Sequence, residues 1–273
     1  MRKIGPLRTS WVAAAVVAAA VATGVPIASG LTSVAGAVPV TPVPTAAGNP
    51  MPAETSEPVR DVAAPRPPRP VEQAAHLLVR VPRDLAARAR PNASAAVVGT
   101  VPSGSKYYDV PTTAWIEKVS PDGRWGRVEI PYVWPRRHGW IALRGLARHT
   151  TKVQLRVDLS EHRITVEKAG RVLFGMPAAT GAAGSPTPPG EYFVTDRIPF
   201  AGGSLGTFAF GISGIQPRLP AGWSGGNQLA IHGTNAPSSI GRSASAGCLR
   251  VSERSLDRLM PLLQLGTPVL VSP

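Results

Sequence analysis

The chain has a single cysteine, Cys248, among its 273 residues. One cysteine cannot form a disulfide within the chain. Exported proteins usually carry even numbers of cysteines and pair them, so a lone thiol in such a chain needs a separate explanation. It is a buried apolar residue, one half of a bridge between chains, or a reactive group.

Acidic residues are scarce as well, since 16 Asp and Glu stand against 29 Lys and Arg, for a formal net charge of +13. No Asp or Glu occurs between Arg197 and Ser252. A chain this basic is expected to meet an anionic partner, which is a cell-wall polymer, an anionic lipid surface or a carboxylate-rich substrate. We expect no nucleic-acid partner, because the N-terminus predicts export.

Residues 1–37 have the three parts of a secretory signal. A basic start precedes an apolar stretch over residues 11–28, and Ala35 and Ala37 occupy the −3 and −1 positions of an A-x-A cleavage site. We predict a signal peptide that ends near Ala37. An uncleaved membrane anchor is the alternative, because about 18 apolar residues are just enough to span a membrane. Either form places the remaining chain in the cell wall or on the extracytoplasmic face of the membrane.

Residues 38–75 are rich in proline and hold no aromatic residue. Such a segment cannot bury enough apolar surface to offset the entropy of the chain, so we predict a disordered linker.

Residues 76–150 are predicted to form a small all-β domain. Runs typical of strands, among them AVVGTV, AWIEKV and RWGRVEI, alternate with turn signals such as SPDG. Four of the six tryptophans fall here, and we expect a barrel of about five strands with an aromatic-rich core or face. The pattern from ARARPNAS to HGWIAL resembles the bacterial SH3-like domains of wall enzymes.

Residues 151–273 are predicted to form a second, mostly β domain with a short C-terminal helix. Apolar and polar residues alternate over 153–157 and again over 163–174. The Gly-rich region 200–227 is interpreted as a loop or flap beside a site. Near the end, SERSLDRLMPLLQLG predicts a helix with Ser252 as its N-cap and Pro261 as a kink, and TPVLVS predicts a last strand.

The lone thiol is preceded by a histidine at the end of a predicted strand. QLAIH delivers His232, and SAGCLRV is a second extended run that holds Cys248. If the two runs pair in a sheet, the imidazole can serve as the base that forms the nucleophilic thiolate. The group that orients the imidazole is then the backbone carbonyl of Gly233 or a carboxylate from elsewhere, such as Asp196 or Glu191.

Arginines without acidic neighbours in sequence accompany the thiol, namely Arg218, Arg242 and Arg250. An electropositive pocket would lower the pKa of the thiol and attract carboxylates. Gly247 allows close backbone approach, and the N–H groups of Gly247 and Cys248 are natural donors to an oxyanion. These residues predict a cysteine acyltransferase or amidase that acts on an anionic peptide.

The stretch IHGTN…IGRSASAGCLRV resembles the L,D-transpeptidase catalytic domain of bacterial cell walls, as do ATGAAGSPTPPGEYFV upstream and LLQLGTPVLV at the end. The resemblance covers residues 152–273 and implies a β-sandwich-like fold. It implies Cys248 as the nucleophile, His232 as the general base and the Gly233 carbonyl as the group that orients the imidazole. It also implies that Gly247 and Cys248 supply the oxyanion N–H groups.

Further residues are assigned to support and substrate binding. The resemblance implies that Ser245 supports the site by hydrogen bonding and that Arg250 holds the substrate or the loop. We expect Thr234, Arg242 and Trp223 to contact the substrate as well.

Two positions depart from the family pattern. Ala246 stands where the family often has histidine, and we expect this to change the polarity around the site without abolishing activity, because His232 remains. Residues 200–227 lack the tyrosine that some relatives carry in the flap, and we expect Trp223 or Phe210 to cover the site instead.

These features predict an exported L,D-transpeptidase that forms 3→3 cross-links between peptidoglycan stem peptides through a thioester on Cys248. Carbapenem β-lactams are the expected inhibitors. No metal or cofactor is expected, because the sequence has neither zinc-ligand spacing around the thiol nor a phosphate-binding loop. Three alternatives stay open. One is an L,D-carboxypeptidase, in which water takes the thioester, and another is a non-catalytic wall-binding protein. The third is an enzyme that attaches another amine, such as a protein lysine, to the stem.

Overall fold

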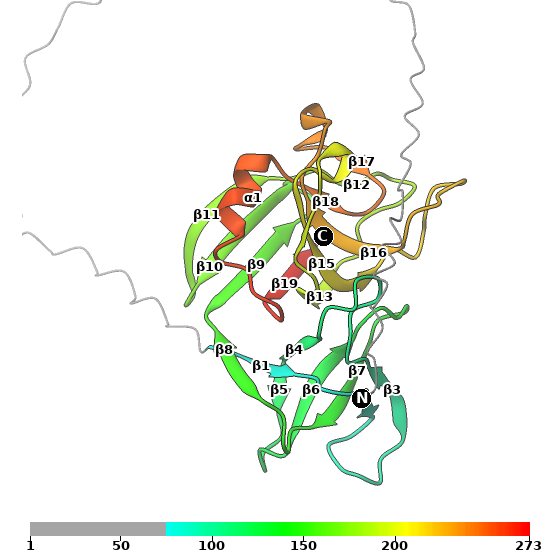
Figure 1. Ribbon diagram of the computed structural model, residues 1–273, viewed down its shortest axis with the longest axis vertical. Helices are drawn as coiled ribbons and strands as arrows, with labels where there is room; N and C mark the ends of the chain where they lie inside the picture. The colour runs from blue at the N-terminus through cyan, green and yellow to red at the C-terminus, as the bar shows by residue number, and fades with distance from the viewer. Residues whose placement is uncertain (1–74) are drawn as a thin grey trace, which may run out of the picture. The chain divides into compact units, whose positions relative to one another are not determined.

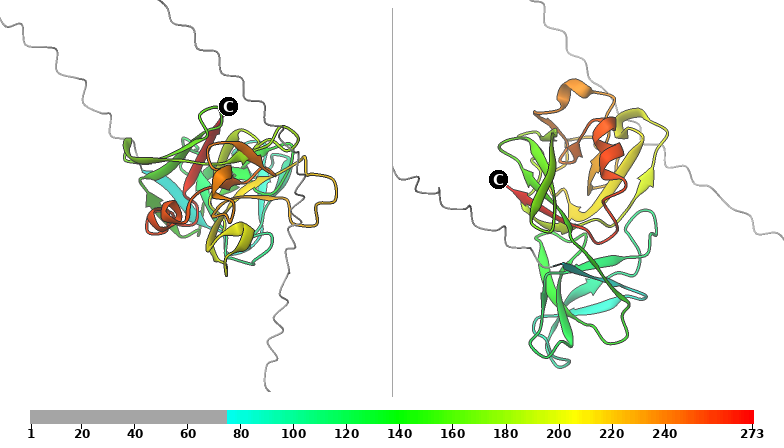
Figure 2. Two further views of the ribbon diagram at one scale, coloured as in Figure 1. Left: turned by 90° about the horizontal axis from the view of Figure 1, so that it is seen from above. Right: turned by 90° about the vertical axis from the view of Figure 1, so that its left-hand side faces the viewer.

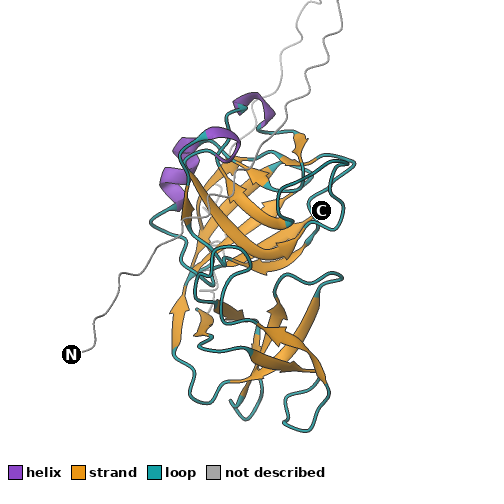
Figure 3. Ribbon diagram, turned by 45° about the vertical axis from the view of Figure 1, so that its right-hand side comes forward, coloured by secondary structure: helices purple, strands orange, loops and turns teal. Residues whose placement is uncertain are grey.

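Strands dominate the structure, which is a computed structural model and describes residues 75–273 (Figure 1). Coloured by secondary structure, these residues are mostly strand and loop (Figure 3). The expected signal segment, residues 1–37, and the expected linker up to residue 74 lie outside the described residues. Within residues 75–273, no helix is long and apolar enough to cross a membrane.

Residues 76–151 form two antiparallel sheets, with the strand orders β4-β1-β8 and β3-β2-β7-β6-β5. The expected domain boundary at residue 150 falls within the last of these strands. The strands are β1 (His76–Arg80), β2 (Leu85–Arg88), β3 (Val97–Val101), β4 (Thr113–Ile116), β5 (Lys118–Val119), β6 (Trp125–Ile130), β7 (Arg137–Ala142) and β8 (Arg148–Thr151).

The core of residues 76–151 is aliphatic, built from Val, Leu, Ile and Ala side chains. None of the four tryptophans of this region is fully buried. Trp115 packs against the core while only partly buried, and Trp134 is 49% exposed. Of the two expected alternatives, the aromatic-rich core is wrong, whereas the aromatic-rich face stays a prediction. The region has eight strands where about five were predicted. Its likeness to SH3-like domains stays a prediction.

Residues 153–273 form two further main sheets, of five and four strands, that share one apolar core in a sandwich-like arrangement. Their strand orders are β11-β10-β9-β19-β13 and β14-β15-β16-β18, with β12 and β17 as a separate pair. The strands are β9 (Val153–Asp158), β10 (Arg163–Lys168), β11 (Arg171–Pro177), β12 (Thr180–Gly181), β13 (Gly190–Phe193), β14 (Ile198–Pro199), β15 (Phe208–Ile215), β16 (Gln228–His232), β17 (Ser243–Ser245), β18 (Leu249–Arg250) and β19 (Pro268–Ser272). The short 3-10 turns η1 (Gly203–Leu205) and η2 (Pro237–Ser239) lie between them.

Strand β15 runs through the region that the sequence predicted to be a loop, so that prediction is wrong for residues 208–215. All of its residues except the first and the last are buried. Burial on both faces removes the alternation of apolar and polar residues that marks a half-exposed strand. Gly211 and Gly214 are needed because a Cβ at either position would overlap the carboxylate of Asp196 or the ring of Tyr192.

The one α-helix of the described residues is α1 (Glu253–Leu259), and it lies against the sheets in both views of Figure 2. It begins as predicted, since the Ser252 side chain accepts a hydrogen bond from the Ser255 N–H at 3.2 Å. It ends at Leu259 instead of continuing through a kink. Met260 still has helical backbone angles, but Pro261 has no N–H with which to continue the helical hydrogen bonds. The last strand, β19, is confirmed.

Residues 75–273 belong to one compact unit, and side chains from both pairs of sheets meet within it. Phe193 of β13 is fully buried, and it packs into the aliphatic core of residues 76–151. Its N–H donates to the Ser213 hydroxyl at 3.1 Å, and that hydroxyl donates to the carboxylate of Glu129 on β6. The Tyr132 N–H donates to the Ser213 carbonyl at 2.7 Å. Strands β6 and β15 are therefore tied through Ser213.

Replacement of Phe193 by alanine tests this shared packing. We expect Phe193→Ala to lower the free energy of unfolding by about 3–5 kcal/mol, because a large buried side chain leaves a cavity. Urea denaturation measures the loss. Leu173→Ala is the control, since Leu173 is 44% exposed on β11 and its loss should stay within about 0.5 kcal/mol. A loss of less than about 1 kcal/mol for Phe193→Ala would contradict the prediction.

Candidate active site

His232 ends strand β16 and is almost fully buried, with 4% of its surface exposed. Its Nδ1 lies 2.6 Å from the carbonyl oxygen of Gly233. Because a carbonyl oxygen can only accept a hydrogen bond, we assign the proton to Nδ1 and leave Nε2 as an acceptor. The imidazole is thus held by a neutral backbone group, with one basic nitrogen available.

Cys248 directly precedes β18, the strand that pairs with β16 in parallel. The register aligns His232 with Arg250, and the two strands lie side by side in Figure 1. The Cys248 Sγ is 3.9 Å from the carbonyl oxygen of Gln228 at the start of β16. The predicted pairing of the two runs is confirmed, and it brings the turn with the thiol to the strand with the imidazole.

Burial acts on the thiol and the imidazole in the direction that keeps both neutral. It lowers the pKa of His232 to about 4, although the Gly233 hydrogen bond acts in the opposite direction. Burial also raises the pKa of the Cys248 thiol and outweighs the opposing charge of Arg250. The expected net lowering of the thiol pKa is therefore wrong. At neutral pH the free protein therefore holds Cys248 as a thiol and His232 as a neutral imidazole.

The turn that carries Cys248 is held by a neutral side chain. The Ser245 hydroxyl accepts from the Gly247 N–H at 3.0 Å and donates to the Cys248 carbonyl at 2.6 Å. Gly247 has a φ of 117°, in the range that favours glycine. Ser245 thus supports the turn, and it occupies the Gly247 N–H, which is one of the two expected oxyanion donors.

Two more side chains form hydrogen bonds with this turn, and neither was predicted from the sequence. The Gln216 amide is buried and donates to the carbonyl of Ala246 at 3.3 Å. It also donates to the carbonyls of Ser185 and Pro186, each at 3.0 Å. The Thr187 hydroxyl donates to the Gly247 carbonyl at 2.7 Å. Thr187 lies in the SPTPPGEY stretch, which is part of the resemblance to the family. Gln216 lies in the expected flap, where no sequence pattern marked it as a functional residue.

The chain has known relatives that share the segment with this site. The family model of the L,D-transpeptidase catalytic domain, YkuD, matches residues 152–271. The protein of Bacillus licheniformis named L,D-transpeptidase YkuD is 30% identical over 124 residues, which are 45% of this chain and 68% of that protein. The chain belongs to the L,D-transpeptidase family.

Further proteins and solved structures are similar to parts of the chain. The YkuD protein of Bacillus subtilis is 27% identical over 124 residues, again 68% of its length. An L,D-transpeptidase structure from Mycobacterium tuberculosis H37Rv has a TM-score of 0.40 and 19% identity, covering 63% of this chain and 76% of that one. The structure of Bdellovibrio bacteriovorus Bd1075 has a TM-score of 0.36 and 22% identity, covering 45% of this chain. The chain thus spans less than half of the length of the Bd1075 chain, namely 48%.

In this L,D-transpeptidase-family site, Glu253 is the carboxylate whose charge acts on His232, where it raises the imidazole pKa. It begins α1, and its Oε2 accepts from the Thr207 N–H at 3.2 Å and from the Thr207 hydroxyl. A Cβ on Gly233 would meet its Oε1 and the backbone of Gly206, so glycine at that position leaves room for the carboxylate. The acid-free stretch ends at Ser252, so Glu253 was the next acidic residue along the chain, but the sequence analysis treated it only as part of a helix.

The two carboxylates that were expected to orient His232 lie elsewhere. Asp196 is fully buried and accepts from the Thr195 hydroxyl at 2.7 Å and the Gln228 amide at 2.6 Å. Glu191 is exposed on β13. The Gly233 carbonyl is the alternative that the structure supports.

The residues expected to bind substrate differ in exposure. Arg250 is half-buried, and its Nε has no hydrogen-bond partner among the described residues. Arg242 is exposed, and the Thr234 hydroxyl accepts from the Ala236 N–H at 3.0 Å. Their contacts with a substrate stay predictions.

The two aromatic residues expected to cover the site differ as well. Phe210 is fully buried in the core of residues 153–273, so its expected role as a cover is wrong. Trp223 is 46% exposed, and its indole N–H donates to the Gly226 carbonyl at 3.0 Å. Cover by Trp223 stays a prediction.

The contribution of the Gln216 hydrogen bonds to stability can be measured with a variant whose side chain has a similar shape. We expect Gln216→Met to lower the free energy of unfolding by about 1–3 kcal/mol, because the carbonyls it serves lose a buried donor. The same variant should change the rate at which iodoacetamide alkylates Cys248, since the turn loosens. Gln264→Met is the control, because the Gln264 amide makes a single 3.4 Å contact with the Thr150 carbonyl. Equal effects of the two variants would show that Gln216 does not hold the turn.

The state of His232 can be read directly by NMR. We expect its imidazole resonances to titrate near pH 4, because burial disfavours the charged form. Since the folded pKa lies below the ordinary value of about 6.5, this group adds stability above that pH and loses it as the pH falls towards 4. A His232→Gln variant assigns the resonance. A midpoint between about pH 6 and 7 would show that burial does not control this group.

Proposed function

We propose that this member of the L,D-transpeptidase family is a cysteine acyltransferase that joins peptidoglycan stem peptides by 3→3 cross-links. The observation that carries the proposal is the placement of Cys248 beside the strand that ends in His232. With Nδ1 engaged by Gly233, the other imidazole nitrogen is left to accept the thiol proton. Cys248 is also the only cysteine that the chain offers as a nucleophile.

Acylation begins with transfer of the thiol proton from Cys248 to Nε2 of His232. Sγ bonds to the carbonyl carbon of the third residue of a tetrapeptide stem, and the C–N bond to the terminal D-alanine breaks. The imidazolium returns the proton to the leaving amine, so D-alanine departs and a thioester remains on Cys248. Because both groups are neutral in the free protein, the thiolate forms only as the attack proceeds.

The second half-reaction releases the enzyme. The side-chain amine of the third residue of another stem attacks the thioester carbonyl, and His232 takes a proton from that amine. The new C–N bond forms, the C–S bond breaks, and the proton returns to Sγ. If water attacks instead, the product is a tripeptide and the enzyme is an L,D-carboxypeptidase.

The oxyanion formed in each step needs donors close to Cys248. We propose the N–H of Cys248 itself as one donor. The Gly247 N–H can become the second only if it leaves the Ser245 hydroxyl, which accepts from it in the free protein. Donors of this kind are worth about 2.7–4 kcal/mol each in other enzymes, so a shift of the turn upon substrate binding would affect the rate strongly.

The positive charge of the chain supports an anionic substrate in an anionic wall. We propose that Arg250, with an Nε that has no hydrogen-bond partner among the described residues, meets a carboxylate of the stem. The net charge of +13 favours association with anionic wall polymers outside the cytoplasmic membrane. The strained amide of a carbapenem offers the thiol a similar carbonyl, so we expect β-lactams of this class to acylate Cys248.

The decisive experiment offers a purified disaccharide-tetrapeptide to the protein and reads products and intact protein by mass spectrometry. We expect a dimer that lacks one D-alanine, and a loss of about 10⁴-fold or more with Cys248→Ala, because the nucleophile is removed. Ser243→Ala, a change in the exposed start of β17, is the matched control and should retain the activity of the unaltered protein.

Other outcomes have distinct meanings. Tripeptide alone would identify a carboxypeptidase in place of a transpeptidase. If no product and no acyl adduct form, while the protein binds isolated sacculi, the enzyme proposal fails in favour of a wall-binding protein.

A further inference from the structure

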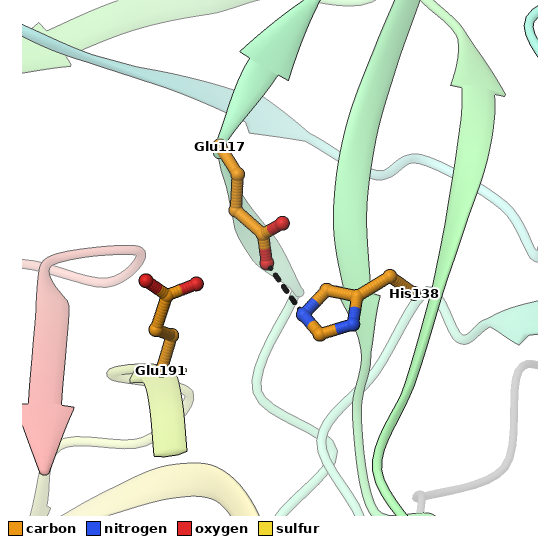
Figure 4. Close-up of side chains that lie close together, drawn as sticks. All are labelled: Glu117, His138 and Glu191. Carbon is orange, nitrogen blue, oxygen red and sulfur yellow. Dashed lines mark ion pairs between the residues drawn. The ribbon is translucent and has the colours of Figure 1, made fainter. Parts of the chain in front are cut away.

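Three side chains that can bind a metal converge away from the candidate active site. Glu117 follows β4, His138 lies on β7, and Glu191 lies on β13, so they come from three separate segments of the chain (Figure 4). One oxygen or nitrogen atom from each lies within 4.8 Å of the corresponding atoms of the other two. Figure 4 shows the Glu117 carboxylate directed towards the imidazole, with the Glu191 carboxylate on the neighbouring segment.

The charge of Glu117 is poorly compensated by the protein. Its side chain is 8% exposed, and neither of its oxygens has a hydrogen-bond partner among the described residues. His138 Nε2 lies 3.1 Å from one oxygen, and Arg127 lies 3.8 Å from the other, beyond hydrogen-bonding distance. The Arg127 side chain is 44% exposed. A buried carboxylate with so little compensation is costly, so a further positive charge is expected here.

A proton on His138 is the simplest source of that charge, but it serves only part of the cluster. The Nε2 proton can be donated to one carboxylate oxygen, which leaves Glu191 and the second oxygen of Glu117 without a donor from His138. Arg136 does not fill the gap, because its Nε pairs with Glu129 at 2.8 Å and its Nη2 donates to the backbone carbonyl of Glu191. A divalent cation would contact all three side chains and balance the two carboxylates.

We propose that Glu117, His138 and Glu191 bind a divalent transition-metal ion, with Zn²⁺ as the best match. Zn²⁺ takes imidazole nitrogen and carboxylate oxygen at about 2.0–2.2 Å, so neighbouring ligand atoms in its tetrahedral shell lie roughly 3.3–3.5 Å apart. The 3.1 Å separation of His138 and Glu117 is close to that spacing. Glu191 is exposed and can approach by rotation of its side chain. A water molecule would complete four-coordination.

The ligand set also discriminates among cations. Ca²⁺ and Mg²⁺ prefer oxygen ligands, and Ca²⁺ requires six to eight of them. An imidazole nitrogen among three protein ligands favours Zn²⁺ or a similar transition metal. This proposal departs from the expectation that the chain binds no metal, which was drawn only from the residues around the thiol.

The ion would stabilise the fold and take no part in the thiol chemistry. Glu117 lies between β4 and β5, and His138 lies on β7, both within residues 76–151, whereas Glu191 lies on β13, an edge strand of the sandwich. Coordination would therefore join segments that are far apart in the sequence. A ligand that binds only the folded protein raises its stability by mass action.

The test titrates Zn²⁺ into the full-length Cys248→Ala protein by calorimetry, because this variant removes the thiol as a competing ligand. We expect one ion per chain, and a rise in Tm of about 5–10 °C at a Zn²⁺ concentration about 100-fold above Kd. Co²⁺ should give visible absorption bands of a low-coordinate site, and Ca²⁺ should give no binding.

Second-site variants in the same background locate the ion. Glu191→Gln should weaken Zn²⁺ binding by about 10-fold or more, since even the loss of an outer partner costs 10–100-fold in known metal sites. Glu161→Gln, the same change at another exposed position, should bind as the parent does. Glu191 is exposed, so its variant is expected to fold, and far-UV circular dichroism confirms that it does.

Two outcomes overturn the proposal. If no Zn²⁺ binds, the cluster is an ion pair between His138 and Glu117 alone. If Zn²⁺ binds equally well to both carboxylate variants, the ion lies elsewhere, for example at His232. The test uses a protein without its thiol, so its result does not depend on the proposed transpeptidation.

Discussion

The parallel pairing of β16 with β18 is the interaction on which the candidate site depends. It aligns His232 with Arg250 and leaves Cys248 in the turn just before β18. A thiol in a turn would be free to move, but here Ser245, Thr187 and Gln216 bind successive carbonyl and N–H groups of that turn. These contacts are all made by neutral side chains, so they impose a conformation without adding charge beside the nucleophile.

Burial is the second constraint, and it decides the charge of the pair. The same desolvation lowers the pKa of His232 and raises that of Cys248, so the two effects favour neutral forms together. The positive charge of Arg250 and the negative charge of Glu253 modify these values but do not reverse them. A neutral pair protects the thiol from adventitious reaction, since the thiolate is the reactive form.

Strand β15, the antiparallel neighbour of β16, carries the link to residues 76–151. Ser213 of β15 binds Glu129 and receives the Phe193 N–H, and Phe193 itself fills the neighbouring aliphatic core. Burial raises the pKa of Glu129 to about 7, although Arg136 acts in the opposite direction. The proposed metal ligands lie along the same boundary, because His138 is opposite Glu129 in the pairing of β6 with β7. Polar contacts at this boundary therefore join the two parts of the described chain.

The sequence by itself determined the class of fold, the N-cap of α1, the strand that ends in His232, and the pairing of that strand with the run that holds the lone thiol. Each of these follows from local rules, namely periodicity, capping and the need of a thiol for a base. Only the tertiary structure decided that β15 is a strand, because burial on both faces erased its alternation. It also decided the roles of Gln216 and Glu253 and the direction of the thiol pKa. These depend on which atoms from distant segments surround a group and exclude water from it, and no local pattern in the sequence records that.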